Sequence, residues 1–271
     1  MRAPANVCLS LWLFAALAVA APAPPIDASL PADQRGRVIA EEGERRDDGF
    51  GDSVVELTMI LRNAEGRERL RRLTWRTLES QTAAEGDRSL TEFHEPRDIE
   101  GTAFLSHTYI GREDDQWLYL PALKRVKRIA SSNKSSAFVG SEFAYEDLLS
   151  DEVEKFDYLW LRDEACGDLV CYVIERRPRY EDSGYSKQVL WLDQSELRPY
   201  RTEFYDRRER LQKTLVFDDY RLYLDRYWRA RVLTMENHQT EKTTTLRFSD
   251  FRFRTGLTTR DFDPSVLQQL R

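Results

Sequence analysis

Two adjacent carboxylates and three histidines are the side chains in this chain most suited to proton transfer. Asp114 and Asp115 could act together as a general acid and a general base. They begin a segment that reads as a strand, and adjacent strand residues point to opposite faces of a sheet. The histidines are His94, His107 and His238, which are far apart in sequence and lack the spacing of metal ligands. We therefore predict no metal site from these residues.

Ser53 lies in a motif that could make it a nucleophile. The motif, Phe50-Gly51-Asp52-Ser53, resembles the nucleophile block of GDSL-type hydrolases. In such a block the serine stands at a turn from an apolar strand into a helix, whereas here charged residues 44–48 precede it and a strand-like run follows. No histidine follows Asp261-Phe262-Asp263 either. We expect that the protein is not an enzyme and needs no cofactor, and a hydrolase is only the third hypothesis.

The N-terminus has the pattern of a signal peptide. Arg2 supplies a positive start, residues 7–19 are almost entirely apolar, and Ala18-Val19-Ala20 is a small-x-small cleavage site. The apolar core is shorter than the roughly 20 residues that span a membrane. Cys8 lies inside this core and not just after the cleavage point, so the pattern is not that of a lipoprotein. We expect a cleaved signal peptide over residues 1–20 and an exported, periplasmic protein.

Cys166 and Cys171 are the two cysteines beyond this leader. They lie between the strand-like runs 156–161 and 172–174, where a disulfide would clamp the mouth of a β-hairpin. The alternatives are a redox couple and a metal site, but the spacing is not C-x-x-C and no histidine is close in sequence. An oxidising compartment favours pairing. We predict a structural disulfide.

The composition argues against nucleic acid as a partner. Hydrophobic residues make up 41% of the chain and charged residues 32%, an ordinary balance for a globular protein. The formal net charge is −6, and it becomes −7 once the leader with Arg2 is removed, because 40 basic residues then stand against 47 acidic ones. Affinity for phosphate backbones depends on lysine and arginine, which an acidic chain does not have in excess.

One segment is a local exception to this acidity, and aromatic residues lie on both sides of it. The positive residues, predicted to contact a partner or an anionic head group, are Lys124, Arg125, Lys127 and Arg128. The aromatic residues, predicted to contact a ligand, are Trp117, Tyr119, Phe138, Phe143 and Tyr145. The alternatives are a solvated edge strand and ordinary core aromatics. Residues 131–136 form either a mobile loop or a lid.

Runs with period-two alternation recur along most of the chain and predict strands. These strands must position the residues named above. Turn residues separate about ten such runs. The helices expected are a charged one over residues 32–44 and a short one over 263–270, capped by Asp263. Between residues 243 and 253 the apolar face changes, which indicates a β-bulge near Ser249-Asp250.

Two short helices cannot cover the apolar face of so large an antiparallel sheet. We predict a mainly β fold in which the sheet curls into an incomplete barrel, with short helices at the mouth. Such a barrel would leave an apolar cavity as the ligand site. Its inner face is expected to carry Leu57, Met59, Trp75, Trp117, Trp191, Phe204 and Phe217. Residues 32–271 are expected to form one domain after a flexible mature N-terminus over 21–31.

Three stretches of this sequence resemble the LolA-like family of outer membrane lipoprotein-sorting proteins. The first motif runs over residues 114–122 and continues into the basic segment, the second runs over 140–147, and residues 95–105 match upstream. In the second motif Glu142 replaces the usual aspartate and Ala144 the usual hydroxyl residue.

The resemblance runs from about residue 35 to the C-terminus and implies an open β-barrel with helices at its mouth. It also implies a periplasmic carrier that holds acyl chains of lipids or lipoproteins in an apolar cavity. An inner-membrane efflux-type transporter, RND- or MMPL-like, is the partner that the family suggests. The alternative hypothesis is a non-catalytic adaptor of such a transporter, with a cavity filled by its own side chains.

Overall fold

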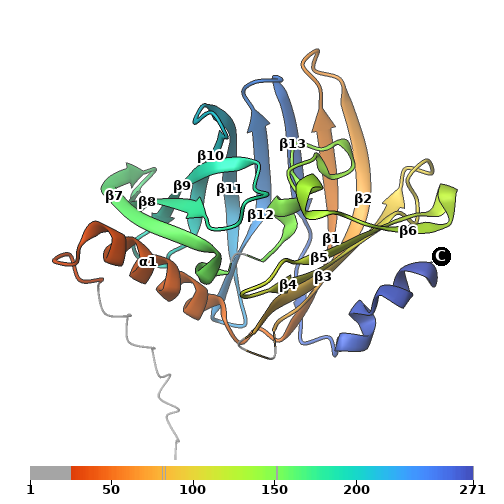
Figure 1. Ribbon diagram of the computed structural model, residues 1–271, viewed down its shortest axis with the longest axis horizontal. Coiled ribbons are helices and arrows are strands. Elements are labelled where there is room, and N and C mark those ends of the chain that lie inside the picture. Colours follow the sequence, from red (N-terminus) through yellow and green to blue (C-terminus); the bar gives the residue numbers. More distant parts are fainter. Residues whose placement is uncertain (1–25, 81, 83, 151, 271) are drawn as a thin grey trace, which may run out of the picture.

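The computed structural model describes residues 26–80, 82, 84–150 and 152–270, so the predicted signal peptide lies outside the described residues. The described chain forms one α-helix, several short 3-10 helices and fourteen strands joined in one antiparallel sheet. Figure 1 shows the sheet as a curved wall. The predicted mainly β, curled architecture is confirmed, whereas the expected number of about ten strands is wrong.

The helix α1 runs over Ala32–Asp47. The strands are β1 (Asp52–Arg62), β2 (Glu68–Leu78), β3 (Glu85–Glu95), β4 (Ala103–Tyr109), β5 (Asp115–Leu120), β6 (Arg125–Arg128), β7 (Phe156–Cys166), β8 (Leu169–Pro178), β9 (Tyr185–Asp193), β10 (Pro199–Asp206), β11 (Leu211–Tyr223), β12 (Tyr227–Asn237), β13 (Lys242–Phe248) and β14 (Arg252–Phe253). The 3-10 helices are η1 (Pro121–Leu123), η2 (Ser131–Asn133), η3 (Phe138–Gly140), η4 (Tyr145–Leu148), η5 (Val153–Lys155), η6 (Thr259–Phe262) and η7 (Pro264–Gln268).

Most neighbouring strands in the sheet are also neighbours in sequence. The order from edge to edge is β6-β5-β4-β3-β2-β1-β13-β12-β11-β10-β9-β8-β7, and the short β14 pairs with β1. The C-terminal half of the sheet joins the N-terminal half through β1 and β13, where Met59 stands opposite Leu246. The edge strands β6 and β7 do not pair with each other, so the barrel is incomplete.

Alternation along the strands divides the sheet into an inner and an outer face. In β1, Leu57 and Met59 belong to the main core, and Leu118 of β5 belongs to the same cluster. Trp117 and Tyr119, the neighbours of Leu118, pack in a separate cluster on the outer face. The sequence therefore predicted correctly that these aromatic residues and Leu118 point to opposite faces.

Three segments cover these faces (Figure 1). Residues 129–149, which we call the plug, lie against the inner face and contribute Phe138, Phe143 and Tyr145 to the main core. Helix α1 covers the part of the inner face formed by β8 and β9, where its Ile39 is fully buried. The C-terminal 3-10 helices η6 and η7 cover the outer face of β3, β4 and β5.

Helix α1 lies directly on strand β7 because it has a glycine at the contact. A Cβ atom at Gly36 would come within 2.7 Å of the backbone nitrogen of Trp160 and 2.8 Å of the carbonyl carbon of Leu159. The neighbouring Arg35 places its guanidinium 4.0 Å from the centre of the Trp160 ring, a favourable contact between a cation and an aromatic face. The helix begins at Ala32 as predicted and ends at Asp47, three residues later than predicted.

The C-terminal end confirms two local predictions. Between the pairs Leu57–Phe248 and Val54–Arg252, strand β1 advances by three residues and the opposite chain by four, which is the predicted bulge. Asp263 caps the last helix by accepting a hydrogen bond from the backbone N–H of Ser265 at 2.9 Å. The helix itself is a short 3-10 helix over Pro264–Gln268.

The predicted disulfide between Cys166 and Cys171 is present. It joins the end of β7 to β8 across their turn, at an edge of the sheet. Cys171 is fully buried with Val173 and Trp191 on the outer face. The bond therefore fixes the outermost hairpin where neighbouring strands support it on one side only.

Replacing Cys166 with serine is expected to lower the free energy of unfolding by about 2 kcal/mol without changing the fold, because the closed loop is short. Urea denaturation, followed by far-UV circular dichroism, measures this loss. Wild-type protein measured under reducing conditions should lose the same amount. Mature protein denatured without a reductant should show no titratable thiol, and two thiols per chain would contradict the prediction.

Among the described residues, no helix combines the length and the apolar character needed to cross a membrane.

Candidate functional site

The plug fills the space that the sequence predicts as a ligand cavity. Phe138 is 1% exposed and packs on Phe93 and Phe104 of the sheet, with ring centres 5.8 and 5.3 Å apart. Tyr145 stands edge-on to Phe138 at 5.6 Å. Phe143 is also buried in this cluster. The prediction of a cavity left open by the barrel is therefore wrong, since aromatic side chains of the chain itself occupy it.

The structure brings together only some of the residues predicted to bind a ligand. Phe138, Phe143 and Tyr145 meet in the main core on the inner face. Trp117 and Tyr119 pack on the outer face, under the C-terminal segment, with buried Phe262 and Leu267 among their neighbours. Period-two alternation shows which residues share a face, but it does not show which face is the concave one.

The list of expected inner-face residues needs two corrections for the same reason. Trp117 and Trp191 both lie on the outer face. The other five members of the list are in or against the main core, as expected: Leu57, Met59, Trp75, Phe204 and Phe217.

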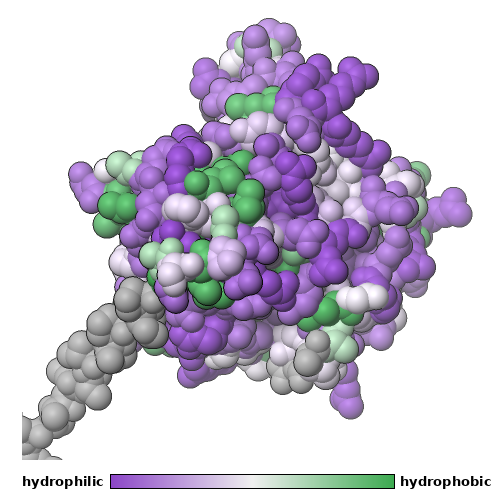
Figure 2. Space-filling view, turned by 60° about the vertical axis from the view of Figure 1, so that its left-hand side comes forward, coloured by the Kyte–Doolittle hydropathy of each residue, from purple (hydrophilic) through white to green (hydrophobic). Residues whose placement is uncertain are grey.

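Half-buried apolar residues surround the plug on the inner face. They pack against the main core without being enclosed by it, and they are Leu61, Trp75, Ile99, Leu120, Phe217, Leu233 and Phe248; Val139 of the plug itself is half-buried in the same way. On the side of the molecule shown in Figure 2, hydrophobic residues form only small groups separated by hydrophilic ones. This side of the molecule therefore shows no large continuous apolar patch.

The C-terminal end of the plug is held by the carboxylate of Glu146. It accepts hydrogen bonds from the hydroxyl of Ser183 and the backbone N–H of Gly184, both at 2.8 Å, and from the hydroxyl of Tyr180 at 3.3 Å. Burial raises the pKa of Glu146, and the neighbouring charge of Asp147 raises it further. This anchor joins the plug to the loop before β9.

Asp147 forms a second anchor, with strand β11. Its carboxylate accepts a hydrogen bond from the hydroxyl of Tyr185 at 2.9 Å and lies 3.5 Å from the ammonium group of Lys213. The Lys213 ammonium also donates to the hydroxyl of Tyr185 at 2.8 Å and to the carbonyl of Glu142 at 2.9 Å. Lys213 is 6% exposed, so these contacts form in a largely dry environment.

A third anchor holds the N-terminal end of the plug. The buried carboxylate of Asp114 lies 3.6 Å from the ammonium group of Lys134 and 2.6 Å from that of Lys155. In the middle of the plug, Arg71 of β2 donates to the backbone carbonyl of Val139 at 2.7 Å. Asp114 is therefore one centre of a structural ion network, whereas Asp115 pairs separately with Arg128.

Sequence reasoning missed the anchoring role of Glu146, Asp147, Tyr185 and Lys213. The two acidic residues stand at the end of the second motif, so the motif itself was an available signal. Lys213 and Tyr185 had no comparable signal, because they lie in ordinary strands that approach the plug only in the folded chain.

The predicted basic segment forms an exposed edge of the sheet. Lys124, Arg125 and Lys127 are exposed, and within the described part of the chain they have no ion pair. Arg128 pairs with Asp115. Strand β6 is the last strand on its side, so three of the four charges are free to meet a partner at this edge. The contact itself remains a prediction.

Asp87 lies where the chain that follows the plug meets β3. Burial raises its pKa to about 7, the hydrogen bond from the backbone N–H of Ser80 opposes this rise, and the charge of Glu152 adds to it. The folded protein therefore keeps the proton on Asp87 up to about pH 7, while the unfolded chain releases it near pH 4. This carboxyl makes folding less favourable as the pH rises through that window.

Asp87→Asn is expected to stabilise the protein at pH 8 and to leave its stability at pH 4 nearly unchanged. The gain should exceed about 1 kcal/mol, because each unit of pKa shift corresponds to about 1.4 kcal/mol. Urea denaturation at both pH values measures it, with Glu56→Gln at an exposed position of β1 as the matched control. Equal stability of Asp87→Asn and the wild type at pH 8 would contradict the prediction.

The comparisons with known proteins agree with this geometry. A family model described as "-like: Uncharacterized protein" matches residues 85–269. A crystal structure from Vibrio parahaemolyticus, named as an outer membrane lipoprotein-sorting protein domain, is 51% identical, with a TM-score of 0.85 over 87% of this chain and 99% of that one. A DUF1329 family protein from Desulfovibrio piger is 29% identical, with a TM-score of 0.83 over 88% of this chain and 100% of that one.

A third solved structure supports the fold alone. It is a LolA superfamily protein from Nitrosomonas europaea, 23% identical, with a TM-score of 0.68 over 88% of this chain and all of that one. A search of curated proteins finds no match. The sequence motifs, the curled sheet and the 51% identical relative together show that this chain belongs to the LolA-like family of outer membrane lipoprotein-sorting proteins.

Proposed function

We propose that this protein is a periplasmic carrier that binds acyl chains of lipids or lipoproteins on the inner face of its sheet. The observation that carries the proposal is the plug, a single segment that buries aromatic side chains against this face and is held by polar anchors at its ends. The name of the 51% identical relative, an outer membrane lipoprotein-sorting protein domain, supports the same function.

The proposed mechanism is an exchange between the plug and the ligand. An acyl chain takes the place of Phe138 and its neighbours and contacts the half-buried residues around them, such as Phe217 and Leu233. The polar anchors are suited to this exchange, because hydrogen bonds and ion pairs that break on opening are replaced by bonds to water. When the acyl chain leaves, the plug returns and keeps the apolar face out of water.

Binding is expected to be weak enough for release. An acyl chain gains about 0.8 kcal/mol for each methylene group moved out of water. Association costs roughly 4–15 kcal/mol, and displacement of the plug adds the loss of its own buried contacts. A chain of about twelve carbons should therefore bind with a dissociation constant between micromolar and millimolar.

Native mass spectrometry of protein purified gently from the periplasm tests the proposal. The expected result is a population with the added mass of a lipid, and uptake of dodecanoate by stripped protein. A short carboxylate such as butyrate is the matched ligand control and should not bind. Lipid-free protein that takes up no dodecanoate at millimolar concentration would overturn the carrier function.

One observation favours a second function. The chain fills its own interior with Phe138, Phe143 and Tyr145, which is the arrangement expected of an adaptor that binds a transporter and carries no lipid. In that case the protein would associate with its partner through the basic edge while the plug stays in place.

Reversing two charges of the basic edge, Arg125→Glu together with Lys127→Glu, is expected to slow association with an anionic partner at least tenfold at low salt. The effect should nearly disappear at high salt, because both residues are exposed. Surface plasmon resonance on immobilised inner-membrane vesicles, which contain anionic lipids and transporters, measures the rate. Arg247→Glu together with Arg252→Glu is the matched control. Equal rates for wild type and edge variant at both ionic strengths would show that the edge is only a solvated strand.

A further inference from the structure

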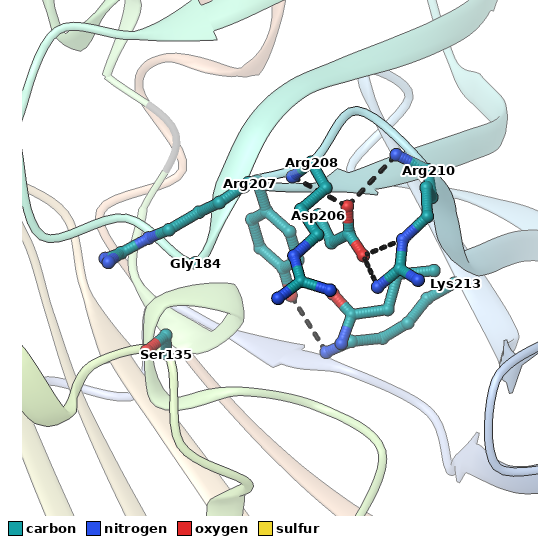
Figure 3. A pocket seen from close by; sticks show the side chains of 9 residues that line it. Ser135, Gly184, Asp206, Arg207, Arg208, Arg210 and Lys213 are labelled. Carbon is teal, nitrogen blue, oxygen red and sulfur yellow. Dashed lines mark hydrogen bonds and ion pairs between the residues drawn. The ribbon is translucent and has the colours of Figure 1, made fainter.

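A polar pocket of about 370 Å³ opens beside the plug (Figure 3). Ser135 of the plug and Gly184 form one side, and the turn between β10 and β11 forms the other. The pocket is lined by Ser135, Gly184, Tyr185, Asp206, Arg207, Arg208, Arg210, Gln212 and Lys213. Four of these nine residues are cationic and only one is acidic.

The single carboxylate in the pocket is already neutralised. Asp206 accepts hydrogen bonds from both the backbone and the guanidinium of Arg210 and from the backbone N–H of Arg208. The bonds from Arg210 hold the pKa of Asp206 well below its usual value. Asp206 therefore fixes the turn and leaves the positive charge of the pocket in excess.

Two arginine side chains are available for a ligand. The guanidinium of Arg208 has no partner among the residues that the structure describes, and Figure 3 shows it reaching toward Lys213. Arg207 uses its Nε atom to donate to the backbone carbonyl of Ser183 at 2.9 Å, and its two terminal nitrogens remain unbonded within the described chain. Lys213, which is paired with Asp147, also lines the pocket and adds an ammonium group at its floor.

We propose that this pocket binds a phosphate group, either as free phosphate or as the head group of a phospholipid. The argument is the excess of guanidinium groups around a space large enough for a tetrahedral oxyanion, in a chain whose net charge is −6. Guanidinium groups bind the oxygens of phosphate in pairs, and such charge-assisted bonds are the stronger ones. Binding of free phosphate does not depend on the proposed carrier function, whereas binding of a phospholipid head group rests on it.

The pocket shares residues with the anchors of the plug. Lys213 faces the pocket and also holds the Glu142 carbonyl and the Asp147 carboxylate. Gly184 faces the pocket and also donates to Glu146. A phosphate bound there attracts the ammonium of Lys213 away from the plug, so a phospholipid would weaken the anchor at the place where its acyl chains must enter.

Isothermal titration calorimetry at low ionic strength tests the site with inorganic phosphate on the full mature chain. We expect binding of one phosphate per chain, weakened at least tenfold in Arg208→Ala, because a hydrogen bond to a charged group commonly contributes that much. Arg69→Ala removes an equal charge from exposed β2 and is the matched control, which should bind like the wild type. Arg208 is exposed and forms no side-chain contact that folding needs.

A second titration uses dihexanoyl phosphatidylglycerol below its critical micelle concentration as the ligand. Tighter binding than inorganic phosphate, lost in Arg208→Ala, supports the head-group assignment. Phosphate binding without tighter binding of the phospholipid supports the anion site and contradicts its link to the carrier function. Two results would overturn the site itself, namely no saturable phosphate binding at millimolar concentrations, or equal weakening by Arg208→Ala and Arg69→Ala.

Discussion

Lys213→Met is expected to release the C-terminal end of the plug and to lower the free energy of unfolding by about 3–5 kcal/mol. The side chains of Lys213 and Asp147 are only 8% and 5% exposed. Removing the ammonium leaves the Asp147 carboxylate buried without its cation, and the carbonyl of Glu142 loses its donor. A buried charge without a partner is among the most destabilising changes that one substitution can make.

Urea denaturation measures the stability, and limited proteolysis reports release of the plug. Lys187→Met is the matched control, because Lys187 pairs with Glu175 at 3.0 Å on the same half of the sheet but is more exposed. That variant should lose no more than about 1 kcal/mol and should keep the plug protected. Equal losses in the two variants, with no new cleavage between residues 129 and 149, would show that Lys213 does not anchor the plug.

Gly36→Ala is expected to separate helix α1 from strand β7 and to cost about 3 kcal/mol. The added methyl group would stand 2.7–2.9 Å from backbone atoms of Leu159 and Trp160, so the helix or the paired strand must shift to make room for it. Overpacking against a fixed neighbour typically costs up to about 3 kcal/mol. The loss should expose Ile39 and the apolar cluster that α1 covers.

Gly43→Ala in the same helix is the matched control for this variant. A Cβ atom there would meet only the Cβ of Leu197, at an ordinary distance of 4.0 Å. Alanine is favoured over glycine inside a helix by about 0.5–1 kcal/mol, so this variant should be more stable than the wild type. Denaturation midpoints and binding of an apolar dye compare the two, and a Gly36→Ala protein as stable as Gly43→Ala would contradict the packing argument.

Residues of the second family motif, 140–147, form the hydrogen bonds that anchor the plug. Glu142, which stands in place of the usual aspartate, accepts a hydrogen bond from the side-chain amide of Asn237 at 2.6 Å. Ala144 stands in place of a hydroxyl residue, and its backbone N–H donates to Asp147 at 2.7 Å. The two departures from the family pattern therefore leave the anchoring bonds of the motif in place.

Local features of the fold were predictable from the sequence because local chemistry determines them. The disulfide and the cap at Asp263 each join residues at most five positions apart. The bulge forms against the distant strand β1, but it was visible within residues 243–253 as a change of the apolar face. The opposite orientations of Trp117 and Leu118 follow from the pleat of one strand. The curled sheet followed from the number of alternating runs and the lack of helices to cover them.

The predictions that the structure contradicts concern contacts between segments that are distant in sequence. Whether Trp117 faces inward depends on the direction in which the whole sheet curls, and the sequence of one strand carries no such information. The position of Phe138 inside the barrel depends on anchors such as Lys213 and Asp114, which come from strand β11 and from the residue before β5. The wrong prediction of an open cavity has the same origin, because the anchors that place residues 129–149 in the interior come from other parts of the chain.

Hydrogen exchange at the plug, measured by mass spectrometry with and without dodecanoate, tests the central claim most directly. The amides of Ile129, Phe138 and Tyr145 are bonded to the backbone carbonyls of Gln116, Phe143 and Ser136 at 2.9, 2.7 and 3.1 Å. If an acyl chain takes the place of the plug, exchange over residues 129–149 becomes faster at saturating dodecanoate, while exchange in β11 and β12 stays slow. Dodecanoate that binds without any change in the plug would contradict the account.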